Sequence, residues 1–510
     1  MELLVKIFFS LALISVFSLL IHLYYVLFLN PQRLRSKLRK QGFNGPPPTF
    51  LLGNIREIKR SQSTTAAMAQ TVQPPLTHNC GATLFPFFEQ WRKEYGPIFT
   101  FSLGNIQLLY VNQPNMVKEM STCTSLDLGK PSYQHKERGH LLGQGILTSN
   151  GAIWAHQRKI LAPELYMEKG MMDLITESTI TLVNSWKSRI DSEEGTIDIK
   201  IDEYIRNFSG DVISRACFGS SYSKGEDIFL RLRALQDAMA LKKFTGVPGL
   251  RYLPTKSNRE IWRLEKEIRS LILKVVKERE EATHEKDLLQ MVLEGAKKSD
   301  LGQDATDRFI VDNCKNIYLA GYETTAVSAT WSLMLLASSP EWQARVRAEV
   351  LEICGGHMPD ADMLRRMKLL TMVIHESLRL YPPVTVLSRE AFKDMKFGDV
   401  HVPKGVNLWT LLVTLHQDPE IWGPDADKFN PERFANGITG ACKLPYVYMP
   451  FGVGPRVCLG QNLAIIELKI LLSLILSNFS FSLSPNYRHS PALRLVIQPE
   501  YGVDLLVTKL

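Results

Sequence analysis

The chain has 510 residues and an ordinary globular composition, with 45% apolar and 22% charged residues. Its formal net charge is +8, and residues 1–45 hold six basic residues against one acidic residue, so a nucleic-acid-binding function has little support. The seven cysteines are scattered and form no C-x-x-C pair, which indicates reduced thiols rather than a disulfide framework.

The N-terminal segment has the length and composition of a membrane span. Residues 7–29 contain no charged residue, and this run exceeds the roughly 20 residues needed to cross a bilayer. A cleaved signal peptide is the alternative, but the apolar run is too long and no small-residue cleavage site follows it. The basic segment at 31–40 comes next, and by the positive-inside rule it keeps the rest of the chain in the cytosol. We therefore expect residues 1–30 to form a single-span anchor in membrane lipid.

A basic and proline-rich segment separates this anchor from the body of the protein. Pro46, Pro47 and Pro48 cannot continue a helix, so we expect a stiff, extended spacer there. These features define a linker over residues 31–50 and a body over residues 51–510.

The body has the pattern of one large helical domain. Residues 97–112 are strand-like and are split by Gly104-Asn105, which is a hairpin signal. Most later segments show apolar spacing of three and four residues, as helices do. Residues 317–337 are nearly apolar enough for a membrane span, but Glu323 favours a buried central helix and becomes a functional-site candidate. The expected fold class is mainly α, with small peripheral β-sheets.

One cysteine stands in the turn-rich segment PFGVGPRVCLG at residues 450–460. An apolar helical pattern follows Cys458, so free backbone N–H groups and the positive end of the helix dipole favour a thiolate there. Gly454 and Gly460 leave room for a flat group to approach the backbone, and Arg456 supplies a fixed cation. A thiolate and a cation for carboxylates are what a haem with its two propionates needs.

Two other interpretations of this cysteine compete with that of a haem ligand, and the first of them remains open at this point. A lone cysteine is most often a buried structural residue. A nucleotide-binding glycine loop is the second alternative, but Val457 occupies the place of the last glycine in G-x-G-x-x-G, so that match fails.

Further motifs in chain order distinguish these interpretations. The frame F-x-x-G-x-R-x-C-x-G resembles the haem-binding signature of cytochromes P450, and AGYETT, ESLR, FNPERF and WAHQR resemble other elements of that family. The resemblance covers nearly the whole chain and implies the P450 fold, a large helical domain with small peripheral sheets behind an N-terminal transmembrane helix. The signature positions are Phe451, Gly454, Arg456, Cys458 and Gly460.

The resemblance assigns cofactor roles to residues along the chain. It implies haem b with its iron axially ligated by Cys458. It also implies that the propionates pair with Trp154, Arg158, Arg389 and Arg456. A buried cluster of Glu376, Arg379 and Arg433 would support the loop that carries the cysteine.

The resemblance also assigns the oxygen chemistry to the central helix. Thr324 would face the oxygen, and Glu323 would relay protons from outside. Gly321 and the neighbouring hydroxyl groups would open the helix locally and leave a groove. The alternative is that Thr324 bonds back to a carbonyl group one turn earlier.

The substrate is expected to be an apolar small molecule. Parts of the sequence are most similar to the plant clan that modifies gibberellins and other terpenoids, which implies a gibberellin-type or related diterpenoid acid, with an oleanane-type triterpenoid as the alternative. Lys242, Lys243 and Arg251 are candidates to meet a substrate carboxylate, although solvated surface charges are the alternative interpretation.

The electron source is expected to be a separate protein, because no flavin or nicotinamide motif occurs in the chain. The resemblance implies NADPH–cytochrome P450 reductase as that partner, NADPH acting only through it, and residence in the endoplasmic reticulum membrane with the catalytic domain in the cytosol. The alternatives of another class are a P450-fold isomerase or dehydratase and a non-catalytic haem-binding protein.

Overall fold

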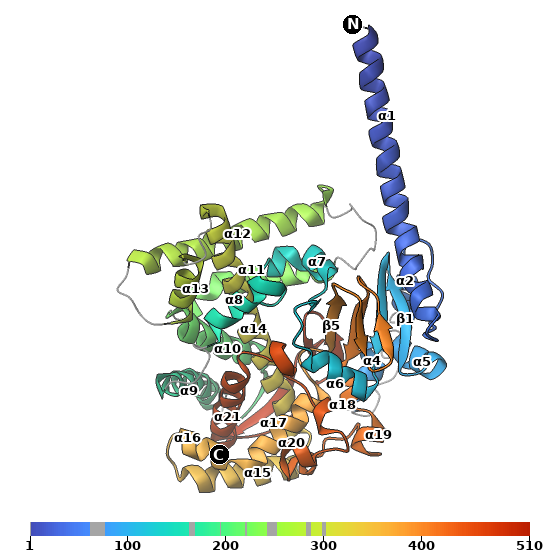
Figure 1. Ribbon diagram of the computed structural model, residues 1–510. Coiled ribbons are helices and arrows are strands. Elements are labelled where there is room, and N and C mark those ends of the chain that lie inside the picture. Colours follow the sequence, from blue (N-terminus) through green and yellow to red (C-terminus); the bar gives the residue numbers. More distant parts are fainter. Residues whose placement is uncertain are drawn as a thin grey trace.

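The computed structural model is a large helical body with small sheets on one side and one long helix standing clear of it (Figure 1). It describes residues 2–61, 77–162, 169–193, 195–219, 222–241, 252–281, 287–297 and 302–510. Lys242, Lys243 and Arg251 lie outside these ranges.

The body is organised around α14, a 35-residue helix over Gln303–Ala337. Its residues from Val311 onward are almost all buried, which confirms the predicted central helix. Three helices that pack on it are α10 (Asp202–Phe218), α17 (Lys368–Leu380) and α21 (Gln461–Asn478). Further α-helices of the body are α4 (Cys80–Leu84), α5 (Pro86–Tyr95), α6 (Pro114–Thr122), α7 (Ser132–Leu142), α8 (Gly151–Leu161), α9 (Lys169–Ser192), α11 (Tyr222–Leu241), α12 (Lys256–Glu281), α13 (Leu288–Lys297), α15 (Pro340–Cys354), α16 (Ala361–Arg366), α18 (Leu412–His416), α19 (Pro419–Trp422) and α20 (Gly437–Gly440).

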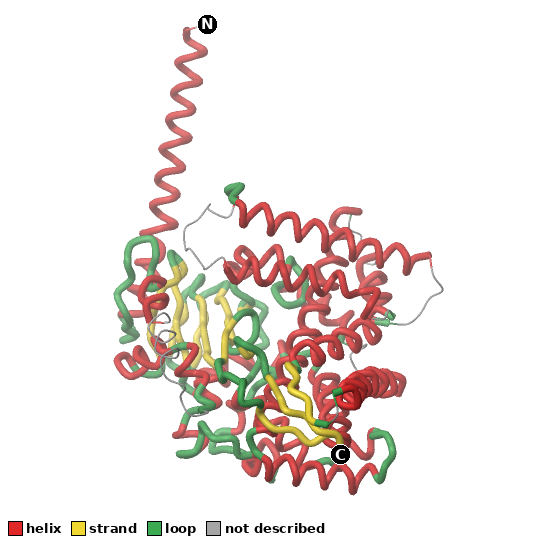
Figure 2. The backbone as a smooth tube through the Cα atoms, turned by 180° about the vertical axis from the view of Figure 1, so that it is seen from behind, coloured by secondary structure: helices red, strands yellow, loops and turns green. Residues whose placement is uncertain are grey.

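A five-stranded sheet forms one side of the body and appears in yellow from behind (Figure 2). Its order is β1 (Ile98–Leu103), β2 (Ile106–Val111), β8 (Asn407–Leu411), β5 (Val386–Ala391) and β3 (Leu128–Gly129). Strands β1 and β2 form the predicted antiparallel hairpin, and Gly104 adopts φ +61° in its turn. Because a side chain is strained at that φ, glycine suits the position. A three-stranded sheet has the order β4 (Thr196–Lys200), β12 (Asp504–Lys509) and β9 (Phe479–Leu483). Strands β6 (Met395–Phe397) and β7 (Val400–Val402) form a two-stranded sheet, and β10 (Pro491–Leu493) and β11 (Ile497–Pro499) form another.

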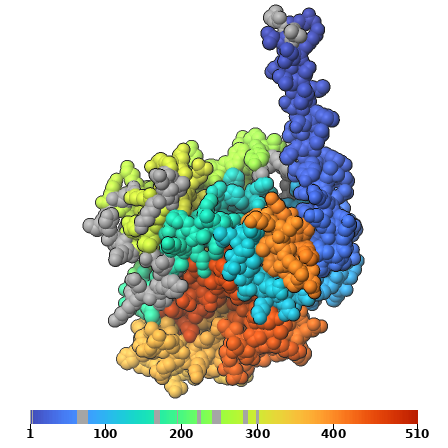
Figure 3. Space-filling model, viewed as in Figure 1, coloured from blue at the N-terminus to red at the C-terminus, as the bar shows by residue number. Residues whose placement is uncertain are grey.

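The N-terminal segment is one helical rod built from α1 (Glu2–Tyr24), a π-helical stretch (Tyr25–Leu29) and α2 (Asn30–Arg39). Leu4–Arg39 is long and apolar enough to cross a membrane, and its apolar window packs on nothing in the protein (Figure 3). Helix α21 passes the same test, but it is mostly buried and belongs to the core. The N-terminal helix therefore fits a single membrane span.

The structure differs from expectation in the segment after the anchor. Residues 30–39 continue the helix, and Leu34 and Leu38 are buried against the body. Beyond them, the Asn44 carbonyl accepts a hydrogen bond of 2.9 Å from the Thr100 N–H, and a Cβ at Gly45 would collide with the Thr100 carbonyl. The expected stiff spacer is thus helical in its first part, over residues 30–39, and its following part lies along β1, where its backbone finds a hydrogen-bond partner.

Two N-terminal deletions separate the anchor from the docked segment. We expect deletion of residues 2–28 to release the protein from membranes without changing its haem content or thermal midpoint, because α1 is exposed along its length. Deletion of residues 2–38 also removes Leu34 and Leu38, whose burial stabilises the fold by about 1.5–3 kcal/mol each, so its midpoint is lower. Alkaline extraction and thermal denaturation measure both effects. Equal midpoints for the two deletions would contradict the docking of α2.

Candidate active site

Cys458 lies in a tight turn just before α21, as the sequence predicts. Its N–H donates a hydrogen bond of 2.9 Å to the Phe451 carbonyl, which closes the turn. Gly452 and Gly454 adopt φ +71° and +70°, which a side chain would strain. Helix α21 begins at Gln461 with Gly460 as its N-cap residue. This geometry presents the sulfur from a rigid loop.

The environment of the Cys458 sulfur differs from the expectation that local groups favour a thiolate there. The side chain is exposed, yet desolvation by surrounding protein raises the pKa of its thiol. The sulfur is thus accessible at its own position while many protein atoms lie around it. The Gly460 N–H and the Arg158 cation lower the pKa, as expected, but burial outweighs them. A bound metal cation supplies the charge that keeps a coordinating thiol deprotonated.

The two glycines of the loop have different roles. A Cβ at Gly454 would collide with the Ser121 carbonyl at the end of α6, so this glycine lets the loop and that helix approach closely. Nothing lies within 4 Å of a Cβ at Gly460. The expectation that both glycines leave room for a flat group is therefore wrong for Gly454, because helix α6 fills that space.

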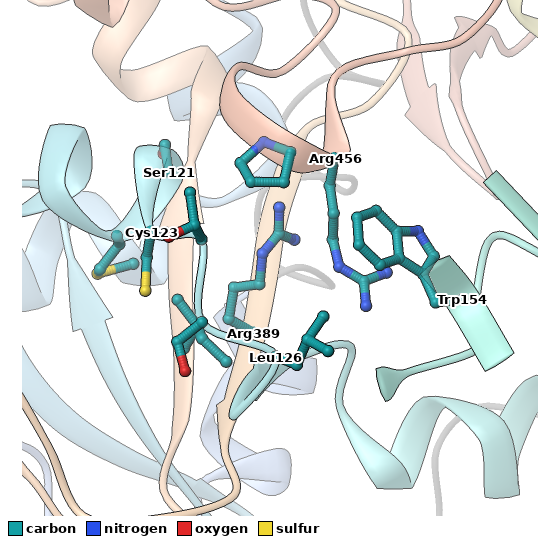
Figure 4. Close-up of a pocket in the computed structure, with 11 residues that line it drawn as sticks. Ser121, Cys123, Leu126, Trp154, Arg389 and Arg456 are labelled. Carbon is teal, nitrogen blue, oxygen red and sulfur yellow. The ribbon is translucent and has the colours of Figure 1, made fainter. Parts of the chain in front are cut away.

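Helix α8 holds the cysteine loop through its tryptophan and arginine. Trp154 is buried, and the Arg456 guanidinium lies 4.2 Å from the centroid of its ring (Figure 4). Arg158 donates a hydrogen bond of 2.9 Å to the Val457 carbonyl, next to the cysteine. Helical spacing of four residues places Trp154 and Arg158 on one face, so both meet the loop.

Several cations lie near the cysteine loop. Arg389 rises from β5 beside Arg456 in the pocket of Figure 4, and burial lowers its pKa to about 10. Burial, together with Arg389 and Arg158, lowers the pKa of Arg456 to about 9. Lys130 and Arg138 also have pKa values lowered chiefly by burial.

This cluster fits the propionates of a haem. Among the described residues, no carboxylate forms an ion pair with Arg389, Arg456, Lys130 or Arg138, and buried cations are costly without an anion. Two propionates facing the cysteine loop supply that anion. Sequence reasoning missed Lys130 and Arg138, because an isolated basic residue is usually a surface residue.

Glu376, Arg379 and Arg433 come together as predicted. Arg379 makes two hydrogen bonds to Glu376, of 2.7 and 2.8 Å, and both side chains are fully buried. The Arg433 Nε lies 3.5 Å from the Glu376 carboxylate, and Arg433 also pairs with Asp425 at 2.6 Å. Asp425 is a fourth member that the sequence did not reveal.

His416 connects this cluster to the cysteine loop. Arg379 donates a hydrogen bond of 2.7 Å to the His416 carbonyl. The His416 Nε2 accepts a hydrogen bond of 3.2 Å from the Met449 N–H, at the start of the loop. Burial, reinforced by Arg379, lowers the pKa of the imidazole to about 3, so it stays neutral and remains an acceptor. The cluster therefore reaches the cysteine loop through this ring.

The candidate proton-transfer residues lie in the middle of α14. The Glu323 carboxyl is 2% exposed, and its Oε2 lies 3.9 Å from the Nε of Arg206 on α10. Burial raises its pKa against the opposing effect of Arg206. The Thr324 hydroxyl donates a hydrogen bond of 2.6 Å to the Ala320 carbonyl, which is the alternative geometry that the sequence left open.

Helix α14 does not open at this point. It is α-helical from Gln303 to Ala337, and a Cβ at Gly321 would collide with Ile213 of α10. The expected local opening is therefore wrong, since Gly321 serves the close packing of two helices. Glu467 of α21, which sequence reasoning missed, is buried, and burial raises its pKa to about 8.

Further toward its N-terminus, α14 holds the loop that follows α7. Asp312 accepts a hydrogen bond of 2.8 Å from the Gln144 N–H, and Asn316 accepts one of 2.8 Å from the Leu147 N–H. Asn316 also donates to the Leu142 carbonyl at 2.7 Å. The loop that bounds the interior on this side is thus fixed to the central helix.

A helical body with peripheral sheets, and a cysteine loop that faces a cationic interior, define a haem-thiolate protein. The cytochrome P450 family model matches residues 75–507. The chain is 54% identical to cytochrome P450 714C2 of Oryza sativa subsp. japonica over 96% of this chain and 95% of that protein. It is 46% identical to cytochrome P450 714A2 of Arabidopsis thaliana over 97% of each chain. The chain belongs to the cytochrome P450 family.

Membership in this family establishes the class of reaction. The protein is a P450 monooxygenase, an oxidoreductase that binds haem through a cysteine thiolate and receives its electrons from a reductase. When bound, the haem supplies the oxygen-activating centre, because a thiolate ligand favours cleavage of the O–O bond.

Proposed function

We propose that this enzyme hydroxylates a polycyclic terpenoid acid, most specifically a gibberellin-type diterpenoid acid, with Cys458 as the haem ligand. The Cys458 loop is the observation that carries the proposal, because its sulfur is accessible and Arg389 and Arg456 lie near the loop as desolvated cations that form no ion pair with a carboxylate among the described residues. Such a site suits a haem and also an acidic substrate. The sequence resemblance to the plant clan that modifies gibberellins supports the terpenoid class.

The proposed roles of the other site residues follow from their positions. Arg389 and Arg456 bind the propionates, with Trp154 and Arg158 fixing the loop beside them. Glu323 is the group that holds and passes a proton at its Oε2, since its raised pKa favours the protonated form. The hydrogen of the Thr324 hydroxyl points to Ala320, so its oxygen acts as an acceptor for water or bound oxygen.

The proposed cellular setting follows from the N-terminal helix. An apolar rod followed by a basic helix suits a single span with the body in the cytosol. We assign the enzyme to the endoplasmic reticulum membrane, where NADPH–cytochrome P450 reductase supplies electrons and lipid surrounds α1.

Turnover in microsomes tests the substrate assignment. The protein is expressed with reductase and given NADPH and a panel of gibberellin-type diterpenoid acids and oleanane-type triterpenoid acids, with products identified by mass spectrometry. We expect an NADPH-dependent gain of one oxygen atom on a diterpenoid acid. Oxidation of triterpenoids alone would assign the enzyme to triterpenoid acids instead of diterpenoid acids. Product formed without NADPH would indicate an isomerase or dehydratase. No product from any compound would contradict the terpenoid assignment.

A further inference from the structure

The side chain of Asn150 does not do what its position in the chain predicts. Asn150 is the N-cap residue of α8, where an asparagine usually accepts a hydrogen bond from the first turn of the helix. Within α8, which the structure describes in full, the side chain makes no such bond. Its Nδ2 donates instead to the Lys130 carbonyl at 2.9 Å, and its Oδ1 accepts the Lys130 N–H at 2.6 Å. The amide thus pairs with the backbone after β3 as a residue of a neighbouring strand does.

The same amide oxygen holds the guanidinium of Arg456. The Arg456 Nη2 donates a hydrogen bond of 2.9 Å to Asn150 Oδ1 and one of 3.2 Å to the Ser149 carbonyl. The guanidinium carbon also lies 4.2 Å from the centroid of the Trp154 ring. Among the described residues, Asn150 is the one side chain that hydrogen-bonds to Arg456. A planar guanidinium that is held at one nitrogen and over one face keeps its other N–H groups in a fixed direction.

The backbone beside Asn150 leaves room for this amide. A Cβ at Gly129 would collide with Asn150 Oδ1, so the glycine lets the amide approach the end of β3. Gly129 pairs with Glu390 of β5, and Glu390 follows Arg389 in that strand. The amide therefore connects the strand pair that carries Arg389 with the loop that carries Arg456, the two cations labelled in the pocket of Figure 4.

The chemistry of the amide suits an orienting role. Because the Asn150 oxygen is a neutral acceptor, it directs the guanidinium without neutralising its positive charge. A carboxylate at this position would form an ion pair with Arg456 and take up that charge. The charge of Arg456 is thus left for an anion in the pocket that Arg456 and Arg389 line, where the propionates are assigned.

We propose that Asn150 is a positioning residue, which orients Arg456 toward a haem propionate and thereby controls how tightly the haem is held and at what potential it is reduced. This inference rests on the proposed role of Arg456 and adds the residue that acts through its guanidinium. A cation fixed beside a propionate compensates negative charge near the iron. When the guanidinium is less well placed, the uncompensated charge favours the ferric state, and the reduction potential becomes more negative.

Haem release and the reduction potential test this assignment. Asn150→Ala removes the amide, and the haem of the purified protein should then transfer to apomyoglobin about tenfold faster, because a hydrogen bond to a charged group is lost. The potential, measured by spectroelectrochemical titration without substrate, should become more negative. If Asn150→Ala is purified without haem, Asn150→Ser, which retains a hydroxyl acceptor, takes its place in each comparison.

Asn313→Ala is the matched control on the same loop. Asn313 Oδ1 accepts a hydrogen bond of 3.2 Å from the Ile146 N–H, and its Nδ2 donates to the Phe309 carbonyl at 2.8 Å. This variant loosens the loop at a point that does not involve Arg456, so it should leave haem release and potential at wild-type values. Equal changes in Asn313→Ala and Asn150→Ala would assign the effect to the loop as a whole and overturn the inference.

A double variant separates positioning of the guanidinium from support of the backbone. In the Arg456→Lys background, Asn150→Ala should change haem release by less than about twofold, because an ammonium lacks the planar set of N–H groups that the amide orients. An equal effect in both backgrounds would limit Asn150 to the Lys130 backbone and overturn the inference. An unchanged potential in Asn150→Ala would overturn it too, even if Arg456→Lys retains no haem.

The proposed role of Arg456 fails in a different way. If Arg456→Lys keeps the wild-type release rate and potential, the guanidinium does not face a propionate, and this inference fails with that assignment. If Arg456→Lys changes both values while Asn150→Ala changes neither, the positioning role alone is overturned.

Discussion

Replacing Cys458 with serine should abolish the Soret band that a thiolate-ligated haem shows with carbon monoxide, and with it all NADPH-dependent turnover. A serine hydroxyl does not ionise near neutral pH, so Cys458→Ser leaves the loop without an anionic ligand. Because the side chain is small and accessible, the substitution should change the free energy of unfolding of the protein little, apart from the loss of haem. The measurement is the dithionite-reduced, carbon-monoxide difference spectrum, with mass spectrometry of products.

Cys442→Ser provides the matched control. Cys442 is half-buried in a separate loop, and burial raises the pKa of its thiol, so it is a neutral packing residue. Its replacement should leave the spectrum and turnover at wild-type values. Retention of the thiolate band in Cys458→Ser would show that Cys458 is not the haem ligand. Loss of the band in Cys442→Ser would indicate that Cys442 is the ligand instead.

Replacing Glu376 with alanine should eliminate haem incorporation rather than slow turnover. The substitution leaves Arg379 and Arg433 buried without their shared anion, and breaking a buried ion pair in this way costs about 3–5 kcal/mol. The Asn430 N–H also loses its acceptor, since Glu376 Oε1 receives it at 2.9 Å. Through Arg379 and His416 the disturbance reaches Met449, where the cysteine loop starts. The haem-to-protein ratio and the thermal midpoint of the purified protein measure the effect.

Glu432→Ala is the control for a surface ion pair. Glu432 bonds to Arg345 at 2.6 Å, but both side chains are well exposed, and exposed pairs contribute little to stability. This variant should keep its haem and its thermal midpoint. Normal haem content in Glu376→Ala would show that the cluster does not support the loop. A variant with full haem but slow turnover would assign Glu376 to catalysis.

The parts of the site that could be predicted are those in which neighbours in space are neighbours in sequence. The frame from Phe451 to Gly460 spans ten residues of one turn, and Trp154 and Arg158 share one helical face. Glu376 and Arg379 are likewise three residues apart on α17 and pair bidentately. In each case local backbone geometry determines which side chains meet, so the spacing alone carries the information.

The parts that could not be predicted depend on what a distant segment brings. Gly454 accommodates the end of α6, Gly321 accommodates Ile213, and the basic residues after the anchor continue a helix whose leucines pack on the body. The raised pKa of the Cys458 thiol could not be predicted either. The local N–H group lowers this pKa, whereas burial by remote protein atoms raises it. Asp425 and His416 lie far from Glu376 in the sequence, and only the tertiary fold brings them to the Glu376 cluster.

The sequence by itself determined the class of fold, the N-terminal helix that is apolar enough to cross a membrane, the turn that carries Cys458 and the Glu376–Arg379 pair, because these depend on periodicity and on short spacings. Only the tertiary structure decided which lone charges became buried and what they face. Lys130 and Arg138 are ordinary basic residues in the sequence, and they gain their significance from desolvation, which the surrounding elements impose together.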